Sequence, residues 1–355
     1  MIDRAVRDGF NPDAVHRRLL KTLTRELAFD PCLDLGKWRR TMRTKLRKLI
    51  GSIPEAPEPR RLIREYEKQR REFTEIRFVF TSEEGVWVPA HLLLPKRIKE
   101  PVPLVICLQG HTSGMNISLG RSRCAEDREW LDGNRDFALQ AVRIGFAAMA
   151  MEQRCFGERR AIRPSRDVKF SHPCRHAAMV SLLLGRTMIG ERVLDIRRVL
   201  EHLKAFPQID CGRIAVMGHS GGGMSAYFAA CLDERIAAVM VSGYLCNFEH
   251  SIAAIDHCED NYIPAFLKYF DLEDLAGLIV PRPLLVVAGE KDPIFPIDGV
   301  RKAYRRIAAI YKAFNASKRL GLVIGSGGHW FHVKEAWPSF MRLTGWNGSK
   351  AGEDS

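Results

Sequence analysis

A short serine motif flanked by glycines is the part of the chain best suited to covalent chemistry. Residues 218–222 read Gly-His-Ser-Gly-Gly, between an apolar run of strand character at 213–217 and a helix-forming run at 224–230. Glycines are needed beside such a serine because the turn is strained and the strand and helix backbones nearly touch. The first N–H groups of the helix then lie where an oxyanion would form. We therefore predict that Ser220 is a nucleophile, in preference to a glycine-rich turn that merely contains a serine.

A serine hydroxyl needs a base, and the base needs an acid that orients it. Continuous apolar runs at 283–288 and 320–324 predict buried parallel strands, which end just before Asp292 and His329. Ligands bind at the carboxyl ends of such strands, so we predict Asp292 as the acid and His329 as the base. Weaker alternatives for these two roles remain open, namely Glu290, Asp256, Glu259 and Asp260 for the acid and His332 for the base.

An oxyanion hole requires a second N–H group, which usually comes from the loop after an earlier strand. An apolar strand is predicted at 103–108, and the loop 109–114 reads Gln-Gly-His-Thr-Ser-Gly. We expect the backbone N–H groups of His111 and Gly221 to be the two donors. A catalytic role for the His111 side chain is the less favoured interpretation.

These motifs together resemble the α/β-hydrolase superfamily, within its dienelactone-hydrolase-like and acetyl-xylan-esterase-like serine hydrolases. The resemblance spans residues 75–345 and is carried by the serine motif, by Met-Glu-Gln-Arg-Cys-Phe-Gly at 151–157 and by Asp292-Pro293. It implies an α/β fold with a mostly parallel, doubly wound sheet and helices on both faces. It also implies a Ser-His-Asp triad that needs no metal or organic cofactor.

The chain departs from the pattern of those relatives at three places. Dienelactone hydrolases have a cysteine nucleophile, whereas this chain has Ser220, so their lactone chemistry does not carry over. The loop after the third strand begins with Gln109 where His is common, which changes the pocket wall. Cys155 stands where the acetyl-xylan-esterase-like loop has glycine, and it fits only if that position does not need a positive φ.

Composition limits the cellular setting of the chain. Its 355 residues are 46% hydrophobic, as in a globular protein, and no apolar run is long enough to span a membrane. Charges near the N-terminus occupy the place of a signal-peptide core, so we expect a cytoplasmic protein. Nine cysteines show no C-x-x-C pair and no convincing zinc spacing. We expect Cys174 and Cys258 to line the pocket, although a disulfide or a metal site there remains open.

The net charge of +13 raises the question of a nucleic-acid partner. Seven of these charges lie within residues 1–75, where basic and apolar residues alternate at helical spacing. Such a pattern is typical of amphipathic helices with solvated basic faces. We therefore expect no nucleic-acid or membrane partner, a small ester as substrate, and the option of a homo-oligomer. The positive charge could also attract anionic substrates.

Three regions are predicted along the chain. Residues 1–72 form a helical extension with a proline-rich break at 51–59, residues 73–346 form the hydrolase domain, and 347–355 form a flexible tail. A hairpin at 76–94 opens the domain, and alternating strands and helices follow. The connections at 155–190 and 243–280 should shape the pocket. Its predicted wall residues are Gln109, Phe156, Cys174, Tyr262 and Trp330, and two further aromatic candidates are Tyr244 and Phe266.

These expectations combine into a carboxylesterase that cleaves short acyl esters through an acyl-enzyme. The preference for acetyl esters comes from the resemblance alone, since a fold does not fix a substrate. A peptidase or amidase on the same fold is the nearest alternative, and a non-catalytic binding protein is the alternative from another class. The order Ser, Asp, His along the chain argues against the last of these.

Overall fold

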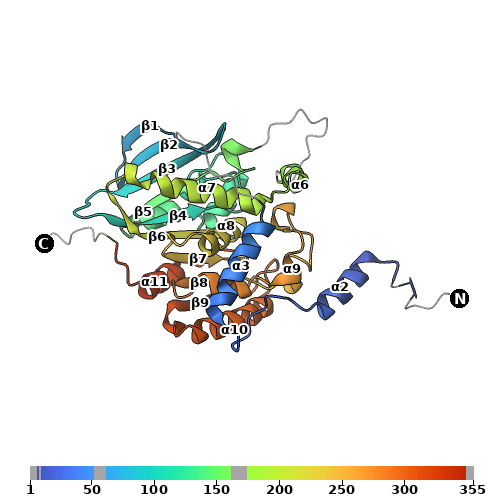
Figure 1. The fold of residues 1–355 in the computed structure, drawn as a ribbon. Coiled ribbons are helices and arrows are strands. Elements are labelled where there is room, and N and C mark those ends of the chain that lie inside the picture. The colour runs from blue at the N-terminus through green and yellow to red at the C-terminus, as the bar shows by residue number, and fades with distance from the viewer. Residues whose placement is uncertain (1–5, 8, 52–60, 161–173, 349–355) are drawn as a thin grey trace, which may run out of the picture.

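The computed structural model describes residues 6–7, 9–51, 61–160 and 174–348. Its centre is one nine-stranded sheet with the strand order β1-β2-β3-β5-β4-β6-β7-β8-β9 (Figure 1). The strands are β1 (Leu62–Gln69), β2 (Phe73–Glu83), β3 (Val86–Pro95), β4 (Val102–Leu108), β5 (Ala147–Met151), β6 (Ile209–His219), β7 (Ala238–Ser242), β8 (Leu284–Gly289) and β9 (Leu320–Gly325). The first three strands pair antiparallel, β3 pairs antiparallel with β5, and the remaining pairs are parallel. The predicted fold class is confirmed.

Helices cover both faces of this sheet and enclose its two larger apolar cores, while a third, small cluster surrounds Phe156. One core lies beneath α3 (Leu35–Leu49), α7 (Met188–His202), α8 (Gly221–Leu232) and α10 (Ile297–Ala313). The other lies beneath α5 (Phe137–Arg143) and α11 (Val333–Thr344). Shorter helices are α2 (Pro12–Thr22), α4 (Glu126–Asp132), α6 (Arg175–Leu183) and α9 (Phe266–Tyr269). Within the described residues, no helix has both the length and the apolar character needed to cross a bilayer.

The expectation that residues 1–72 are helical is wrong at Leu62–Gln69, which form the edge strand β1. This segment is rich in Arg, Glu, Lys and Gln, which favour helix locally. Its antiparallel pairing with β2 satisfies the backbone groups of both strands and overrides that preference. Most of the predicted proline-rich break, at 52–59, lies outside the described residues, as does 349–355 of the predicted tail.

α3 shows the amphipathic pattern that the sequence predicts for the N-terminal helices. Trp38, Met42 and Leu46, one turn apart, are buried against the rest of the protein. A Cβ on Gly277 would lie 2.4 Å from the Trp38 ring, so a glycine is required where the ring packs. By contrast, α2 lies at the periphery of the molecule (Figure 1), where it borders a hollow shared with residues 249–262, and none of its residues is buried.

We expect Trp38→Ala to lower the free energy of unfolding by about 3–5 kcal/mol, the usual cost of truncating a buried large aromatic side chain. Urea unfolding followed by circular dichroism measures the change. The matched control is Leu19→Ala on α2, where the side chain is exposed and the change should stay within about 0.5 kcal/mol. Equal stability of the wild type and Trp38→Ala would show that α3 contributes little to the core.

Candidate active site

Ser220 lies in a strained turn between β6 and α8. Its φ of 57° and ψ of −126° lie in a region that residues with side chains seldom adopt. A Cβ on Gly218 would lie 2.2 Å from the Gly222 backbone, and one on Gly222 would lie 2.1 Å from the Leu108 carbonyl oxygen. The glycines of the motif are thus required by close backbone approach, as the sequence predicts.

His329 and Asp292 meet at the ends of β9 and β8. The distance from His329 Nδ1 to Asp292 Oδ2 is 2.7 Å. The other carboxylate oxygen, Oδ1, accepts hydrogen bonds from the backbone N–H groups of Ile294 (2.9 Å) and Phe295 (3.0 Å). The Phe295 ring also stacks on His329, with ring centroids 5.7 Å apart. The carboxylate is therefore fixed in orientation and assigns the Nδ1–H tautomer to His329, which leaves Nε2 free to accept a proton.

The alternatives for the acid and base occupy other positions. Among the described residues, Asp292 is the only one whose carboxylate forms a hydrogen bond with the His329 ring. Glu290 and Asp256 are exposed, and Glu259 pairs with Arg175. Asp260 is buried against Arg192, and His332 packs against the backbone of Gly325.

Ser220 and His329 line one cavity of about 660 Å³. Its other walls come from the loop after β4, from α4 and from the segment between β7 and β8. They include Thr112, Ser113, Trp130, Arg135, Arg160, Ile255, His257, Cys258 and Ile294. The long insertion at 243–280 thus contributes to the wall, as expected, and so does α4, which the sequence analysis did not single out. The length of chain between the predicted strands at 103–108 and 146–151 was the available signal for that contribution.

The predicted wall residues need correction, because none of the five lines this cavity. Gln109 is buried beneath the loop, where its side-chain amide donates to Ser118 Oγ (2.7 Å) and to the Arg135 carbonyl oxygen (2.6 Å). Phe156 is buried behind His111, with ring centroids 5.2 Å apart. Tyr262 borders a separate hollow beside α2, Trp330 is exposed at the surface, and Cys174 is buried outside the lining. Of the two further aromatic candidates, Tyr244 and Phe266 are both core residues.

Arg135 is a site residue that the sequence analysis missed. It donates from Nη2 to the His329 carbonyl oxygen at 3.0 Å and lies over the Trp130 ring at 4.4 Å. Burial lowers the pKa of Arg135 to about 10, so it remains charged at neutral pH. The guanidinium therefore supports the loop that carries His329 and places a positive charge in the cavity wall.

The predicted oxyanion loop packs directly on the serine turn. A Cβ on Gly110 would lie 2.9 Å from Ser220 Cβ and 3.3 Å from the backbone nitrogen of Gly221. The backbone N–H groups of His111 and Gly221 therefore belong to two segments in close contact. The His111 ring lies beside this turn as well, since its Nδ1 would be 3.2 Å from a Cβ on Gly221.

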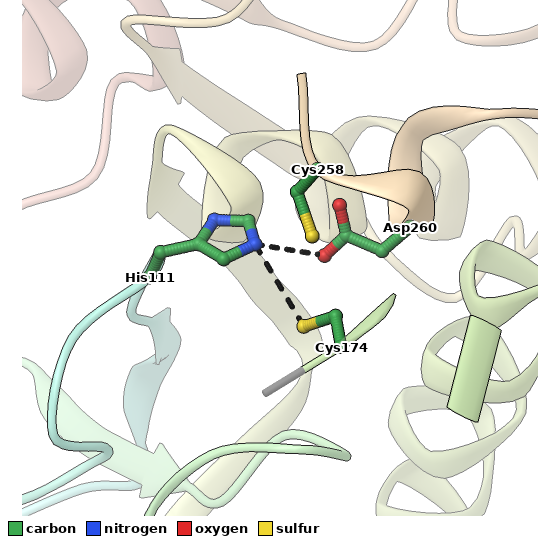
Figure 2. Close-up of side chains that lie close together, drawn as sticks. All are labelled: His111, Cys174, Cys258 and Asp260. Carbon is green, nitrogen blue, oxygen red and sulfur yellow. Dashed lines mark hydrogen bonds and ion pairs between the residues drawn. The ribbon is translucent and has the colours of Figure 1, made fainter. Parts of the chain in front are cut away.

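The other edge of the His111 ring faces a buried group of polar side chains (Figure 2). Its Nε2 lies 3.2 Å from Asp260 Oδ2 and 3.7 Å from Cys174 Sγ. Burial disfavours the charged imidazole, but Asp260 and Cys174 outweigh burial and raise the pKa of His111 to about 10. Thus the side chain has partners of its own beyond the backbone role expected from the sequence.

Cys155 has a φ of 75°, so the condition under which it would fit the glycine position of related loops is not met. A cysteine at such a φ is expected to cost about 1–3 kcal/mol. Its neighbours hold the loop in place. The Arg154 carbonyl oxygen accepts from Arg192 Nη2 at 3.0 Å, and the Arg154 side chain pairs with Glu191 and Asp195.

The Glu152 side chain holds the predicted oxyanion loop in place through hydrogen bonds to its backbone. Its buried carboxyl group accepts from the backbone N–H groups of Met115 (3.0 Å) and Glu158 (3.3 Å). Gly114 and Gly157 pack so closely on it that a Cβ at either position would collide with the carboxyl oxygens. Burial outweighs these hydrogen bonds and raises the pKa of Glu152 to about 7.

This raised pKa predicts a pH-dependent contribution to stability. Between pH 4.5 and 7 the folded state holds a proton on Glu152 that the unfolded state has released, so the contribution is full below pH 4.5 and lost as the pH rises through 7. Relative to Glu152→Gln, an uncharged isostere, we expect the wild type to lose about 3 kcal/mol over this range. Urea unfolding of both proteins is measured across pH 4–8. The contributions of the other titrating groups cancel in the difference between the two unfolding free energies. A difference between them that does not vary with pH would contradict the prediction.

The strained serine, the His–Asp pair and the mostly parallel sheet define the class of this molecule as an α/β hydrolase. The chain belongs to the Abhydrolase family, whose sequence model matches residues 10–318, a range that includes Ser220 and Asp292. It is 26% identical over 298 residues to "Putative hydrolase YtaP" of Bacillus subtilis (strain 168), covering 82% of this chain and 94% of that protein.

Solved structures share the fold at low sequence identity. A "putative acetyl xylan esterase" from Bacteroides fragilis NCTC 9343 superposes with a TM-score of 0.73 at 18% identity, covering 95% of this chain and 90% of that chain. A glucuronoyl esterase from Solibacter usitatus has a TM-score of 0.64 at 14% identity, covering 91% and 97%. The predicted superfamily is confirmed by these similarities in fold and by the family match.

Proposed function

We propose that this protein is a serine carboxylesterase that cleaves short acyl esters, with acetyl esters preferred. The observation that carries the proposal is the 2.7 Å hydrogen bond between His329 and Asp292 at the rim of the cavity that Ser220 also lines. These three side chains supply a nucleophile, a base and an orienting acid in one place.

The proposed reaction proceeds in two halves. Ser220 Oγ attacks the ester carbonyl carbon while His329 Nε2 takes the hydroxyl proton, and the oxyanion accepts hydrogen bonds from the N–H groups of His111 and Gly221. Collapse of this intermediate breaks the bond to the alcohol oxygen, which receives the proton from His329. Water then attacks the acyl-enzyme with the same proton transfers and releases the acid and free Ser220.

The cavity supports a small ester substrate. A volume of about 660 Å³ lies within the usual range of small-molecule sites and accommodates a short acyl group with an alcohol of sugar size. The names of two structural neighbours, an acetyl xylan esterase and a glucuronoyl esterase, also favour esters of carbohydrates. Arg135 and Arg160 in the wall could bind polar or anionic parts of the alcohol.

A series of p-nitrophenyl esters of increasing acyl length tests this proposal. We expect kcat/KM to be highest for the acetyl ester and to fall with each longer chain, and a fluorophosphonate probe to label wild-type protein at Ser220. The corresponding anilide, run in parallel, distinguishes an amidase, because it presents the same acyl group with an amide bond. No ester hydrolysis, or labelling that persists in Ser220→Ala, would overturn the proposal.

A further inference from the structure

Four potential metal ligands from three distant parts of the chain converge beside the active site. His111 comes from the loop after β4, Cys174 directly precedes α6, and Cys258 and Asp260 lie between β7 and β8. Their donor atoms all lie within 4.8 Å of one another (Figure 2). A nitrogen, two sulfurs and a carboxylate oxygen are the donor types that zinc takes in proteins.

Two of the separations between donor atoms are close to the edges of a tetrahedron around zinc. With ordinary Zn–N, Zn–O and Zn–S bonds, tetrahedral geometry places nitrogen and oxygen about 3.4 Å apart and nitrogen and sulfur about 3.6 Å apart. In the structure His111 Nε2 lies 3.2 Å from Asp260 Oδ2 and 3.7 Å from Cys174 Sγ. These two separations therefore fit tetrahedral coordination of one ion by His111, Cys174 and Asp260.

Hydrogen bonds from neighbouring residues hold two of the four, Asp260 and Cys174, as metal ligands are usually held. Arg192, which is fully buried, donates to Asp260 Oδ2 at 2.7 Å and to Cys174 Sγ at 3.3 Å. Asn261 Nδ2 donates to the other oxygen of Asp260 at 2.9 Å. Hydrogen bonds of this kind orient ligands around a bound ion.

Charge balance favours a divalent ion. Two thiolates and a carboxylate carry three negative charges, while zinc and Arg192 together carry three positive ones, so the group, in which Asp260, Cys174 and Arg192 are buried, becomes neutral. A neutral group avoids the cost of a buried net charge. Arg192 also lies over the Phe156 ring at 4.6 Å, which fixes the guanidinium beside the two ligands that it contacts.

We propose that His111, Cys174, Cys258 and Asp260 bind one zinc ion, with release to solvent of the thiol protons and of the proton that the His111 ring carries on Nε2. Four protein ligands leave no open position, so the ion is structural and does not contact the substrate. Coordination through Nε2 keeps the proton of His111 on Nδ1, the nitrogen that lies beside the serine turn. The ion would therefore link the loop after β4 to the start of α6 and to residues 258–260. Any effect of this link on ester hydrolysis rests on the proposed function, because it acts through the predicted oxyanion loop.

The site is absent from the sequence prediction because its ligands lack the close spacing of a zinc motif. Pocket lining was preferred to a metal site at Cys174 and Cys258 because that spacing and a C-x-x-C pair are both absent. The two cysteines that the sequence left open as pocket, disulfide or metal residues are the two in the group. Among the described residues, these four form the one group of three or more His, Cys, Asp or Glu side chains close enough to share an ion.

Metal content of the full-length protein tests the proposal directly. Protein purified under reducing conditions, and dialysed without chelator, is analysed by inductively coupled plasma mass spectrometry; we expect about one zinc per chain. Cobalt substitution should give a thiolate-to-cobalt charge-transfer band. In Cys258→Ser the zinc affinity should fall roughly a hundredfold or more, because one of the four ligands is lost. The matched control is Cys211→Ser, an exposed cysteine outside the group, which should retain the zinc.

If Cys258→Ser does not fold, zinc titration of the wild-type protein still tests the proposal. Chelator-treated, reduced wild type is titrated with Zn²⁺ against a competing fluorescent zinc indicator, and one tight equivalent is expected. No bound zinc, or equal binding by Cys258→Ser, would overturn the proposal. Ser220→Ala should bind zinc as the wild type does, so failure of the esterase proposal is distinguishable from failure of the zinc proposal.

Discussion

Replacement of Ser220 by alanine is expected to lower kcat for ester hydrolysis by about 10⁵–10⁶-fold, because the bond to the acyl group can no longer form. The residual rate should come from the oxyanion donors and from substrate binding, which the substitution leaves in place. The rate is measured with p-nitrophenyl acetate, after correction for the background hydrolysis of the ester.

A matched control is available one helical turn away. Ser225 is also buried in α8, and its hydroxyl donates to the Gly221 carbonyl oxygen at 3.1 Å. Ser225→Ala should therefore keep most of the activity. If Ser220→Ala retained more than about one-hundredth of the wild-type rate, the proposed nucleophile would be wrong, since removing such a group costs far more than that.

Asp292→Asn is expected to lower kcat by about 10⁴-fold while the fold is kept. The reason lies in the two backbone N–H groups of Ile294 and Phe295, which bind one carboxylate oxygen. They will hold the amide oxygen of asparagine on their side and turn its NH₂ group toward His329 Nδ1. Nδ1 must then accept, so the proton moves to Nε2, where it prevents the ring from taking the Ser220 proton.

Thermal unfolding and the rate with p-nitrophenyl acetate measure the two parts of this expectation. Asp256→Asn serves as the control, because Asp256 lines the same cavity but is exposed. It should stay within a few-fold of the wild type. A rate for Asp292→Asn within tenfold of the wild type would transfer the acid role to another carboxylate and contradict the proposed triad.

Most of the sheet could be predicted from the sequence because its strands carry their own signal. A strand buried on both faces must be apolar throughout, and the run at 283–288 corresponds closely to β8, which is buried along its whole length. The run at 320–324 corresponds closely to β9, which is half-buried at the edge of the sheet. β1 lacked this signal, since it is a charged edge strand whose residues favour helix by themselves. Its conformation depends on β2, which supplies the hydrogen-bonding partner.

The active site likewise has a part that local sequence signals predict and a part that they do not. Ser220, Asp292 and His329 follow predicted strands, so their approach to one another follows from the order of a parallel sheet. The cavity wall was predicted poorly because insertions between strands have no repeating pattern. Aromatic residues there, such as Phe156 and Tyr244, are buried in cores, while α4 and Arg135 border the cavity.

Local sequence patterns were enough to predict the serine turn, the strands of the parallel sheet and the order of the three triad candidates. These depend on short-range requirements: space for backbone contact at Gly218 and Gly222, and continuous apolar burial along a strand. Three features became evident in the folded chain alone: the pairing of β1, the composition of the cavity wall, and the approach of His111 to Cys174, Cys258 and Asp260. Those features depend on contacts between segments far apart in the chain, whose positions are set by the packing of the whole molecule and by no local pattern.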